Sequence, residues 1–189
     1  MSFIVVLVLL VLVVIVLISV FNGLVGKRVA TENSWSQIDV QLKRRHDLIP
    51  NLVETVKGYA GHEKETLERV IQARNSAVTA GQSQGVAGQA QAENMLSGAL
   101  RQLFALSESY PNLKANENFA KLQEELSSTE NRIGFARQFY NDSVAAYNAA
   151  IEQVPGNLVK GFGNFPRKEF FELGADEAQA VRVAPKVGF

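Results

Sequence analysis

The sequence predicts an all-α protein: an N-terminal transmembrane helix, an elongated antiparallel bundle of about four helices, and an irregular Gly/Phe-rich C-terminal tail. Three observations predict this class. Every residue from 3 to 18 is apolar, two long later segments repeat apolar residues in steps of three and four, and this period stops at Pro155. Such steps are the spacing of one face of an α-helix. We therefore divide the chain into an anchor of residues 1–21, a bundle domain of residues 22–154 and a tail of residues 155–189.

The apolar N-terminal stretch has the length of a membrane span. About nineteen residues at 1.5 Å per residue cover roughly 28 Å, close to the hydrocarbon thickness of a bilayer. The stretch is rich in Val and Ile, but a backbone in lipid must satisfy its hydrogen bonds internally and therefore forms a helix. The alternative is a cleaved signal peptide. Against it, no basic residue precedes the stretch, which is also long for a signal peptide.

Basic residues lie on one side of this stretch only. Two uncharged residues precede it, whereas five basic residues follow it closely: Lys27, Arg28, Lys43, Arg44 and Arg45. Since flanking Lys and Arg residues stay in the cytoplasm, the asymmetry predicts an N-terminus outside and a soluble domain in the cytoplasm. Only residues 22–26, with two glycines, separate the stretch from the next helical pattern. We therefore expect the anchor and the first helix to be nearly continuous.

The first helix of the bundle carries an apolar seam with one polar member. The seam consists of Trp35, Ile38, Leu42, Arg45, Ile49, Leu52, Val56 and Tyr59. Pro50 lies inside it, where its ring clashes with the carbonyl of His46 and removes one backbone hydrogen bond. Because the seam keeps its phase across Pro50, we predict a kink; the alternative is two helices that meet at residues 48–50. Gly58 and Gly61 mark the first turn.

Two shorter helices follow. The first is predicted from about residue 62 to 80 and the second from about residue 91 to 109, before Pro111. Residues 80–92 between them are rich in Gly, Gln, Ser and Ala, which is the composition of a flexible linker. We predict a surface loop there.

The fourth helix is predicted from Asn116, a suitable N-cap residue, to the Pro155-Gly156 pair. Tyr140 and Tyr147 lie seven residues apart on one face, so we predict that both are core residues whose hydroxyls have hydrogen-bond partners. The tail after Pro155 shows no helical period. Its five phenylalanines would promote aggregation if all were left in water, so we expect them to dock on the bundle or on a neighbouring subunit.

The sequence contains no recognisable catalytic or cofactor site. It has no cysteine, and its two histidines, His46 and His62, are accompanied only by scattered carboxylates, which are too few ligands for a metal. No serine lies in a nucleophile elbow, and the glycines of residues 81–88 do not form a phosphate-binding loop. We expect both histidines to be solvated or to cap a helix. The sequence therefore predicts a protein that is not an enzyme and has no cofactor or metal.

The charged residues do not indicate a nucleic-acid partner, because the net charge is zero and the two signs are mixed. The basic run 43–45 is flanked by aspartates, and we interpret it as surface charge with one arginine folded over the seam. A kink exposes backbone, and the tail offers aromatic side chains. These features give the candidate interaction residues Arg44, Arg45, His46, Asp47, Pro50, Asn51, Phe162 and Phe165.

Two segments of the chain carry a family resemblance. Residues 35–63 read WSQIDVQLKRRHDLIPNLVETVKGYAGHE, and a second block covers residues 130–148 and continues to Phe165-Pro166. Both blocks resemble the bacterial LemA family. The resemblance implies a single-pass N-terminal anchor and a bundle of long antiparallel helices, and it implies no catalytic activity. It also points to membrane organisation, since one relative is associated with magnetosome membranes and members are discussed alongside membrane proteases.

From the anchor, the long seams and the missing catalytic groups we expect a scaffold that self-associates at the bacterial inner membrane through its tail or its anchor. Its partners would be the lipid bilayer and further copies of the chain. The alternative is an adaptor that recruits a membrane protein, such as a protease or a transporter, through the kink at residues 47–51. A third alternative is an enzyme that uses His46 or His62.

Overall fold

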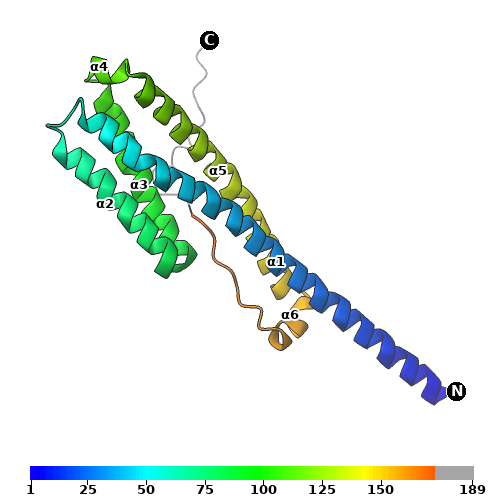
Figure 1. The fold of residues 1–189 in the computed structure, drawn as a ribbon. Helices are drawn as coiled ribbons and strands as arrows, with labels where there is room; N and C mark the ends of the chain where they lie inside the picture. The colour runs from blue at the N-terminus through cyan, green and yellow to red at the C-terminus, as the bar shows by residue number, and fades with distance from the viewer. Residues whose placement is uncertain (173–189) are drawn as a thin grey trace, which may run out of the picture. The chain divides into compact units, whose positions relative to one another are not determined.

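The computed structural model describes residues 1–172, and all regular structure in that range is helical (Figure 1). The elements are α1 (Ser2–Lys57), α2 (Lys64–Ser83), α3 (Gly85–Ser107), α4 (Pro111–Lys114), α5 (Glu117–Glu152), α6 (Gly156–Val159) and a 3₁₀ turn η1 (Lys160–Phe162). The predicted all-α class and the long apolar N-terminal helix are confirmed.

Helix α1 runs without a break from the apolar stretch into the later, more polar part of the chain. Gly23, Gly26 and Pro50 all lie inside it, so the predicted continuity is confirmed and the alternative of two helices meeting at residues 48–50 is wrong. Residues 3–18 are exposed along their whole length. This part of α1 is long and apolar enough to cross a membrane, and nothing in residues 1–172 buries it.

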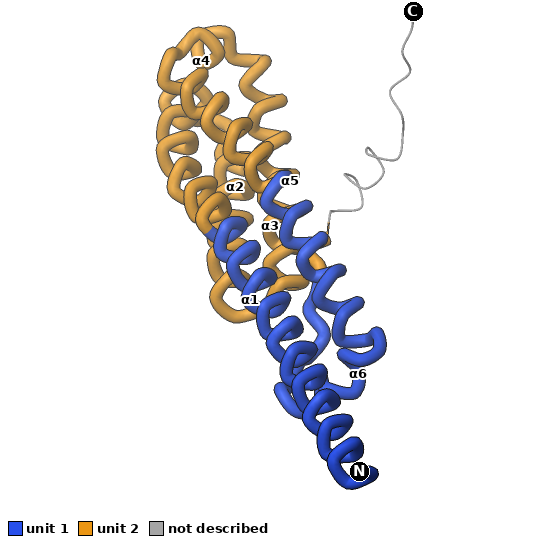
Figure 2. The backbone as a smooth tube through the Cα atoms, turned by 90° about the vertical axis from the view of Figure 1, so that its right-hand side faces the viewer, with its two compact units in different colours: residues 1–39, 135–169 blue, residues 40–134, 170–189 orange. Residues whose placement is uncertain are grey.

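The chain forms two compact units, each of which combines parts of α1 and α5 (Figure 2). Unit 1 contains residues 1–39 and 135–169, and the described part of unit 2 contains residues 40–134 and 170–172. In unit 2, buried apolar residues of α1, α2, α3 and α5 form one core, to which Leu113 of α4 contributes. The predicted division at residues 21 and 154 follows different boundaries and stays a prediction.

Helices α2 and α3 lie side by side in unit 2 and are joined by Gln84 alone. The prediction of a loop at residues 80–92 is wrong, because α2 continues to Ser83 and α3 begins at Gly85. Gly85 has a φ of 69°, a left-handed conformation that favours glycine and permits the tight turn. The segment is helical because Ala and Gln are good helix formers and because Ala80, Ala90 and Ala92 are buried.

Helix α5 begins directly after the N-cap residue that the sequence predicts. The side-chain oxygen of Asn116 accepts a hydrogen bond from the backbone N–H of Phe119 at 2.9 Å, so the predicted N-cap is confirmed. Pro111 occupies the start of the short helix α4, where a missing N–H costs no intrahelical bond.

In unit 1, the segment after α5 lies along α5 through side-chain hydrogen bonds. The hydroxyls of Tyr140 and Tyr147 donate to the backbone oxygens of Glu169 (2.9 Å) and Pro166 (3.0 Å), which confirms the predicted core tyrosines. Burial, with a smaller contribution from the charge of Glu169, raises the pKa of Tyr140 to about 12. The side-chain amide of Asn148 both donates to the backbone oxygen of Lys168 and accepts from its N–H, each at 2.9 Å.

The tail begins with two short helical elements, α6 and η1, so the prediction that it has no helical structure is wrong for residues 156–162. Its phenylalanines differ in exposure. Phe165 (5%) and Phe171 (2%) are buried, whereas Phe162 is 88% exposed and Phe170 is 37% exposed. Phe189 lies outside the described residues.

Candidate functional site

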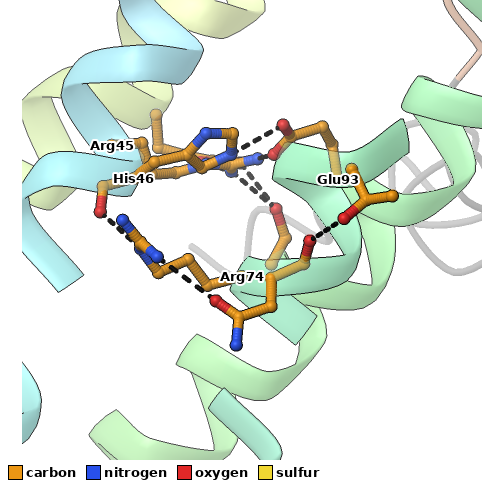
Figure 3. A network of polar contacts seen from close by, with 8 residues as sticks. Arg45, His46, Arg74 and Glu93 are labelled. Carbon is orange, nitrogen blue, oxygen red and sulfur yellow. Dashed lines mark hydrogen bonds and ion pairs between the residues drawn. The ribbon is translucent and has the colours of Figure 1, made fainter. Parts of the chain in front are cut away.

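Unit 2 contains a buried polar cluster that joins four helices (Figure 3). Arg45 and His46 come from α1, Arg74 from α2, Glu93 and Ser97 from α3, and Glu130 from α5. The side chains converge because each residue lies on the face that its helix turns towards the core of unit 2.

Arg45 is the centre of this cluster and is only 1% exposed. Its guanidinium forms ion pairs with Glu93 and Glu130 and donates to the hydroxyl of Ser97 at 2.9 Å. The Ser97 hydroxyl in turn donates to Glu130 at 3.1 Å. Removing a charge from water is costly unless partners compensate it, and here two carboxylates and a hydroxyl do so. The Nε of Arg45 is also buried, and no group in the described chain accepts from it.

His46 and Glu93 form a second interaction within the cluster. The His46 Nε2 lies 2.8 Å from a carboxylate oxygen of Glu93. Burial alone would raise the pKa of Glu93, but the hydrogen bond from His46 and the charge of Arg45 together outweigh it and lower the pKa. Because an ionised carboxylate only accepts hydrogen bonds, the Nε2 of His46 is the donor.

The backbone carbonyl of His46 shows how α1 continues through Pro50. In a regular helix this carbonyl would accept from the N–H of residue 50, which proline lacks. The Nε of Arg74 from α2 donates to it instead, at 2.8 Å. A tertiary contact therefore replaces the lost helical hydrogen bond.

Beside the cluster lies a cavity of about 310 Å³ between α3 and α5. Its lining combines apolar side chains with polar ones: Leu100, Phe104 and Leu126 with Arg45, Ser97, Arg101, Gln123, Ser127, Glu130 and Asn131. This volume is at the small end of ligand pockets, and one bulky side chain or a small ligand would fill it.

The structure brings together only two of the candidate residues in this cluster. Arg45 and His46 are buried and paired, so the expectation of a solvated or capping His46 is wrong. The physical reason is that His46 lies next to the seam and faces α3, where Glu93 meets it. His62, the other histidine, is exposed and lies in the turn before α2.

The other candidate residues lie elsewhere. Arg44 is exposed and pairs with Glu125 at 3.6 Å, and Asp47, Pro50 and Asn51 are exposed on α1. Phe162 and Phe165 belong to unit 1, where Phe162 is exposed and Phe165 is buried.

Sequence reasoning missed the acidic half of the cluster. Glu93 is the only acidic residue of α3, and it lies at helical spacing from the buried residues Gln89, Leu96 and Leu100. A single carboxylate on the buried face of a helix indicates that a cation from another helix lies buried beside it. The prediction of a loop at residues 80–92 hid the buried positions before Glu93, such as Gln89, that place it on the core face of α3. In the part of the chain that the structure describes, no group of three or more potential ligands could hold a metal ion.

Comparison with known proteins gives matches over most of the chain. The family model described as "LemA family" matches residues 34–189. The chain is 26% identical over 174 residues to the magnetosome protein MamQ of Magnetospirillum gryphiswaldense. The aligned region covers 80% of this chain and 64% of that protein. It is 28% identical over 140 residues to the protein LemA of Metamycoplasma hominis, covering 73% of this chain and 62% of that protein. The chain thus spans less than two thirds of the length of these relatives.

Proposed function

The chain belongs to the LemA family, and on that premise we propose that it is a non-enzymatic, membrane-anchored scaffold that self-associates at the bacterial inner membrane. The apolar, exposed stretch of α1 supports the anchor. A relative named as a magnetosome protein supports a role at a membrane. The long helices of the chain supply a surface on which copies could assemble.

One observation carries the proposal of self-association. Phe135 (75% exposed) and Phe139 (55% exposed) lie one helical turn apart on α5, well after the apolar stretch of α1. Two neighbouring aromatic side chains in water are unfavourable and are typical of an interaction surface. Copies anchored in one bilayer are related by an axis along the membrane normal. A twofold axis of this kind places the same patch of both copies at the same height above the membrane, so that the two pairs of phenylalanines can pack against each other.

Disulfide trapping tests this surface, because the chain has no cysteine of its own. In native membranes, we expect Phe139→Cys to form a disulfide-linked dimer under mild oxidation. Ala145→Cys, at another exposed position of α5, is the control and should stay monomeric. Monomeric Phe139→Cys, together with a wild-type protein that remains monomeric in mass photometry at every concentration, would contradict self-association.

The cavity in unit 2 favours a second candidate function, an adaptor that recruits a membrane protein such as a protease or transporter. The cavity is lined by both apolar and polar side chains and has the size of a single side chain of a partner. We place recruitment here rather than at residues 47–51, because Arg74 already occupies the carbonyl that Pro50 leaves free.

Filling the cavity tests the adaptor. Ser127→Trp places a large ring in the cavity, whereas Ser128→Trp changes an exposed neighbour outside the lining. After crosslinking in native membranes, a partner that binds at the cavity should be lost with Ser127→Trp and kept with Ser128→Trp. If both variants capture the same proteins as the wild type, recruitment at the cavity is wrong.

We also propose that the soluble part lies in the cytoplasm, because basic residues such as Lys27 and Arg28 follow the anchor. A membrane-impermeant maleimide should label Gln138→Cys only after the inner membrane is permeabilised. Labelling in intact spheroplasts would show that the soluble part lies outside the cytoplasm.

A further inference from the structure

The turn that follows α5 packs against α1 just after the apolar stretch. Within unit 1, Phe21, Leu24 and Val25 of α1 form a small core with Tyr147, Ile151 and Phe165. The rings of Phe21 and Phe165 meet edge to face, with centroids 5.4 Å apart. We call residues 154–162, which contain α6 and η1, the α6 turn. In Figure 1 this turn lies beside α1.

Gly156 of the α6 turn lies close to the end of α5 and in ordinary contact with α1, and Gly163, just after the turn, lies close to α1. A Cβ at Gly156 would lie 1.9 Å from the backbone oxygen of Ala150 and 3.6 Å from a methyl of Leu24. A Cβ at Gly163 would lie 2.6 Å from the ring of Phe21. A side chain at Gly156 would collide with the backbone, and one at Gly163 would force the rings of Phe21 and Phe165 to move. The α6 turn and the segment after it therefore lie beside residues 21–24 of α1.

That level coincides with the expected edge of the bilayer. From Phe3 to Phe21, α1 rises about 27 Å, which nearly equals the roughly 30 Å of hydrocarbon in a bilayer. The headgroup region adds about 5–7 Å on each side. Residues that pack on Phe21 and Leu24 therefore lie where hydrocarbon gives way to headgroups.

The α6 turn presents apolar side chains at this level. Val154 (75%), Leu158 (64%) and Phe162 (88%) are exposed and recur every four residues. Exposed cations accompany them, with Lys160 inside the turn and Lys27 on α1. Apolar side chains flanked by basic ones are the composition of segments that bind the surface of an anionic bilayer. In water the same three side chains would form an unfavourable apolar patch.

We propose that the α6 turn is a second membrane contact, in which Val154, Leu158 and Phe162 enter the leaflet from which α1 emerges. The inference rests on the proposed membrane anchor. A single helix can rotate and tilt freely in a bilayer, whereas a second contact beside it fixes the orientation of unit 1. A surface held in one orientation meets the same surface of another copy more readily, as self-association requires.

Depth-dependent fluorescence quenching tests this contact with the full chain in vesicles of phosphatidylethanolamine and phosphatidylglycerol. Because the chain has no cysteine, each of four variants takes a single fluorescent label: Val11→Cys, Gln138→Cys, Leu158→Cys and Phe162→Cys. Lipids with a nitroxide high or low on the acyl chain then report the depth of each label. Gln138 is the matched aqueous control, since it is exposed on α5 and about 21 Å along that helix before its end.

We expect shallow nitroxides to quench most of the fluorescence at positions 158 and 162, deep nitroxides to quench position 11, and neither to affect position 138. If position 11 is quenched but positions 158 and 162 behave like position 138, the α6 turn does not touch the membrane although the anchor is correct. If position 11 is also unquenched, the anchor itself fails. If labels at 158 and 162 are shielded from aqueous iodide but not quenched by lipid, protein covers the turn, and the membrane contact is wrong.

Discussion

Arg44 and Arg45 are adjacent on α1, yet their surroundings differ completely. Arg45 lies on the seam, is buried, and pairs with Glu93 and Glu130. The side chain of Arg44 is 51% exposed and lies 3.6 Å from Glu125. One residue corresponds to a rotation of about 100° around a helix, which is enough to move a side chain from the core to the solvent. An arginine therefore contributes to the core at position 45, whereas the arginine at position 44 contributes little to the structure.

Replacing each arginine with methionine should measure this difference. Arg45→Met leaves the carboxylate of Glu93 buried without its main cation, which typically costs about 3–5 kcal/mol. Arg44→Met removes only an exposed ion pair, which contributes about 0–1 kcal/mol. Thermal unfolding in detergent, followed by circular dichroism, should show a large loss for Arg45→Met and almost none for Arg44→Met. Equal effects would mean that Arg45 is not buried among its partners.

The pKa of Glu93 predicts how stability depends on pH. Since the folded pKa lies below the ordinary value of 4.5, the unfolded chain takes up the proton first as the pH falls. The stabilisation by Glu93 is therefore present above about pH 4.5 and is lost as the pH falls through the folded pKa.

Glu93→Gln should accordingly lower the thermal midpoint at neutral pH, and the difference from the wild type should shrink as the pH falls below about 4.5. Glu125→Gln, which changes an exposed carboxylate, is the control and should show a small gap at every pH. A gap for Glu93→Gln that stays constant over this range would mean that Glu93 has no lowered pKa.

At the scale of single elements, α1 is continuous at a residue that normally interrupts helices. Proline removes a backbone donor and costs about 3 kcal/mol inside a helix. Here the guanidinium of Arg74 supplies the missing donor to His46. The helix therefore depends on α2 at this point, because α1 alone cannot satisfy the carbonyl.

A double-mutant cycle between Pro50 and Arg74 should reveal this dependence. Arg74→Met leaves the His46 carbonyl without a donor and should cost about 1–3 kcal/mol. In the Pro50→Ala background the restored amide at position 50 satisfies the carbonyl, so the same substitution should cost less. The coupling free energy from urea unfolding of the four proteins should be about 0.5 kcal/mol or more. Strictly additive effects would show that Arg74 does not compensate for Pro50.

At the scale of the whole molecule, one helix carries the apolar stretch and also contributes to both compact units. Gly23 and Gly26 lie where the apolar stretch ends. A Cβ at either position would meet nothing within 4 Å, so neither glycine is required by packing. Glycine in a helix is less favourable than alanine by about 0.5–1 kcal/mol, because it loses more conformational freedom on folding.

The double substitution Gly23→Ala and Gly26→Ala should therefore raise the thermal midpoint. Gly156→Ala is the control and should lower the thermal midpoint, because its Cβ would collide with the backbone oxygen of Ala150. Both variants can be compared by circular dichroism in detergent. Destabilisation by the Gly23 and Gly26 substitutions would indicate that α1 bends there and needs the glycines.

The sequence by itself determined the features that depend on near neighbours in the chain. Apolar residues in steps of three and four identify a helix and its buried face, whatever lies against that face. The seam of α1 and the core tyrosines were predicted on this basis, the apolar stretch from its length, and the cap at Asn116 from its residue type. Composition was a poorer guide than periodicity, as the helical residues 80–92 show.

Only the tertiary structure decided which faces meet. Arg45 and Glu93 are far apart in the sequence, and their pairing depends on how α1 and α3 pack. The same holds for Arg74, which reaches the His46 carbonyl from α2, and for Phe165, which is buried while Phe162 is exposed. Periodicity describes one helix at a time, whereas a buried charge or ring is stabilised by partners from other elements. For that reason the helices could be predicted from the sequence, but the buried cluster and the packing of the α6 turn against α1 could not.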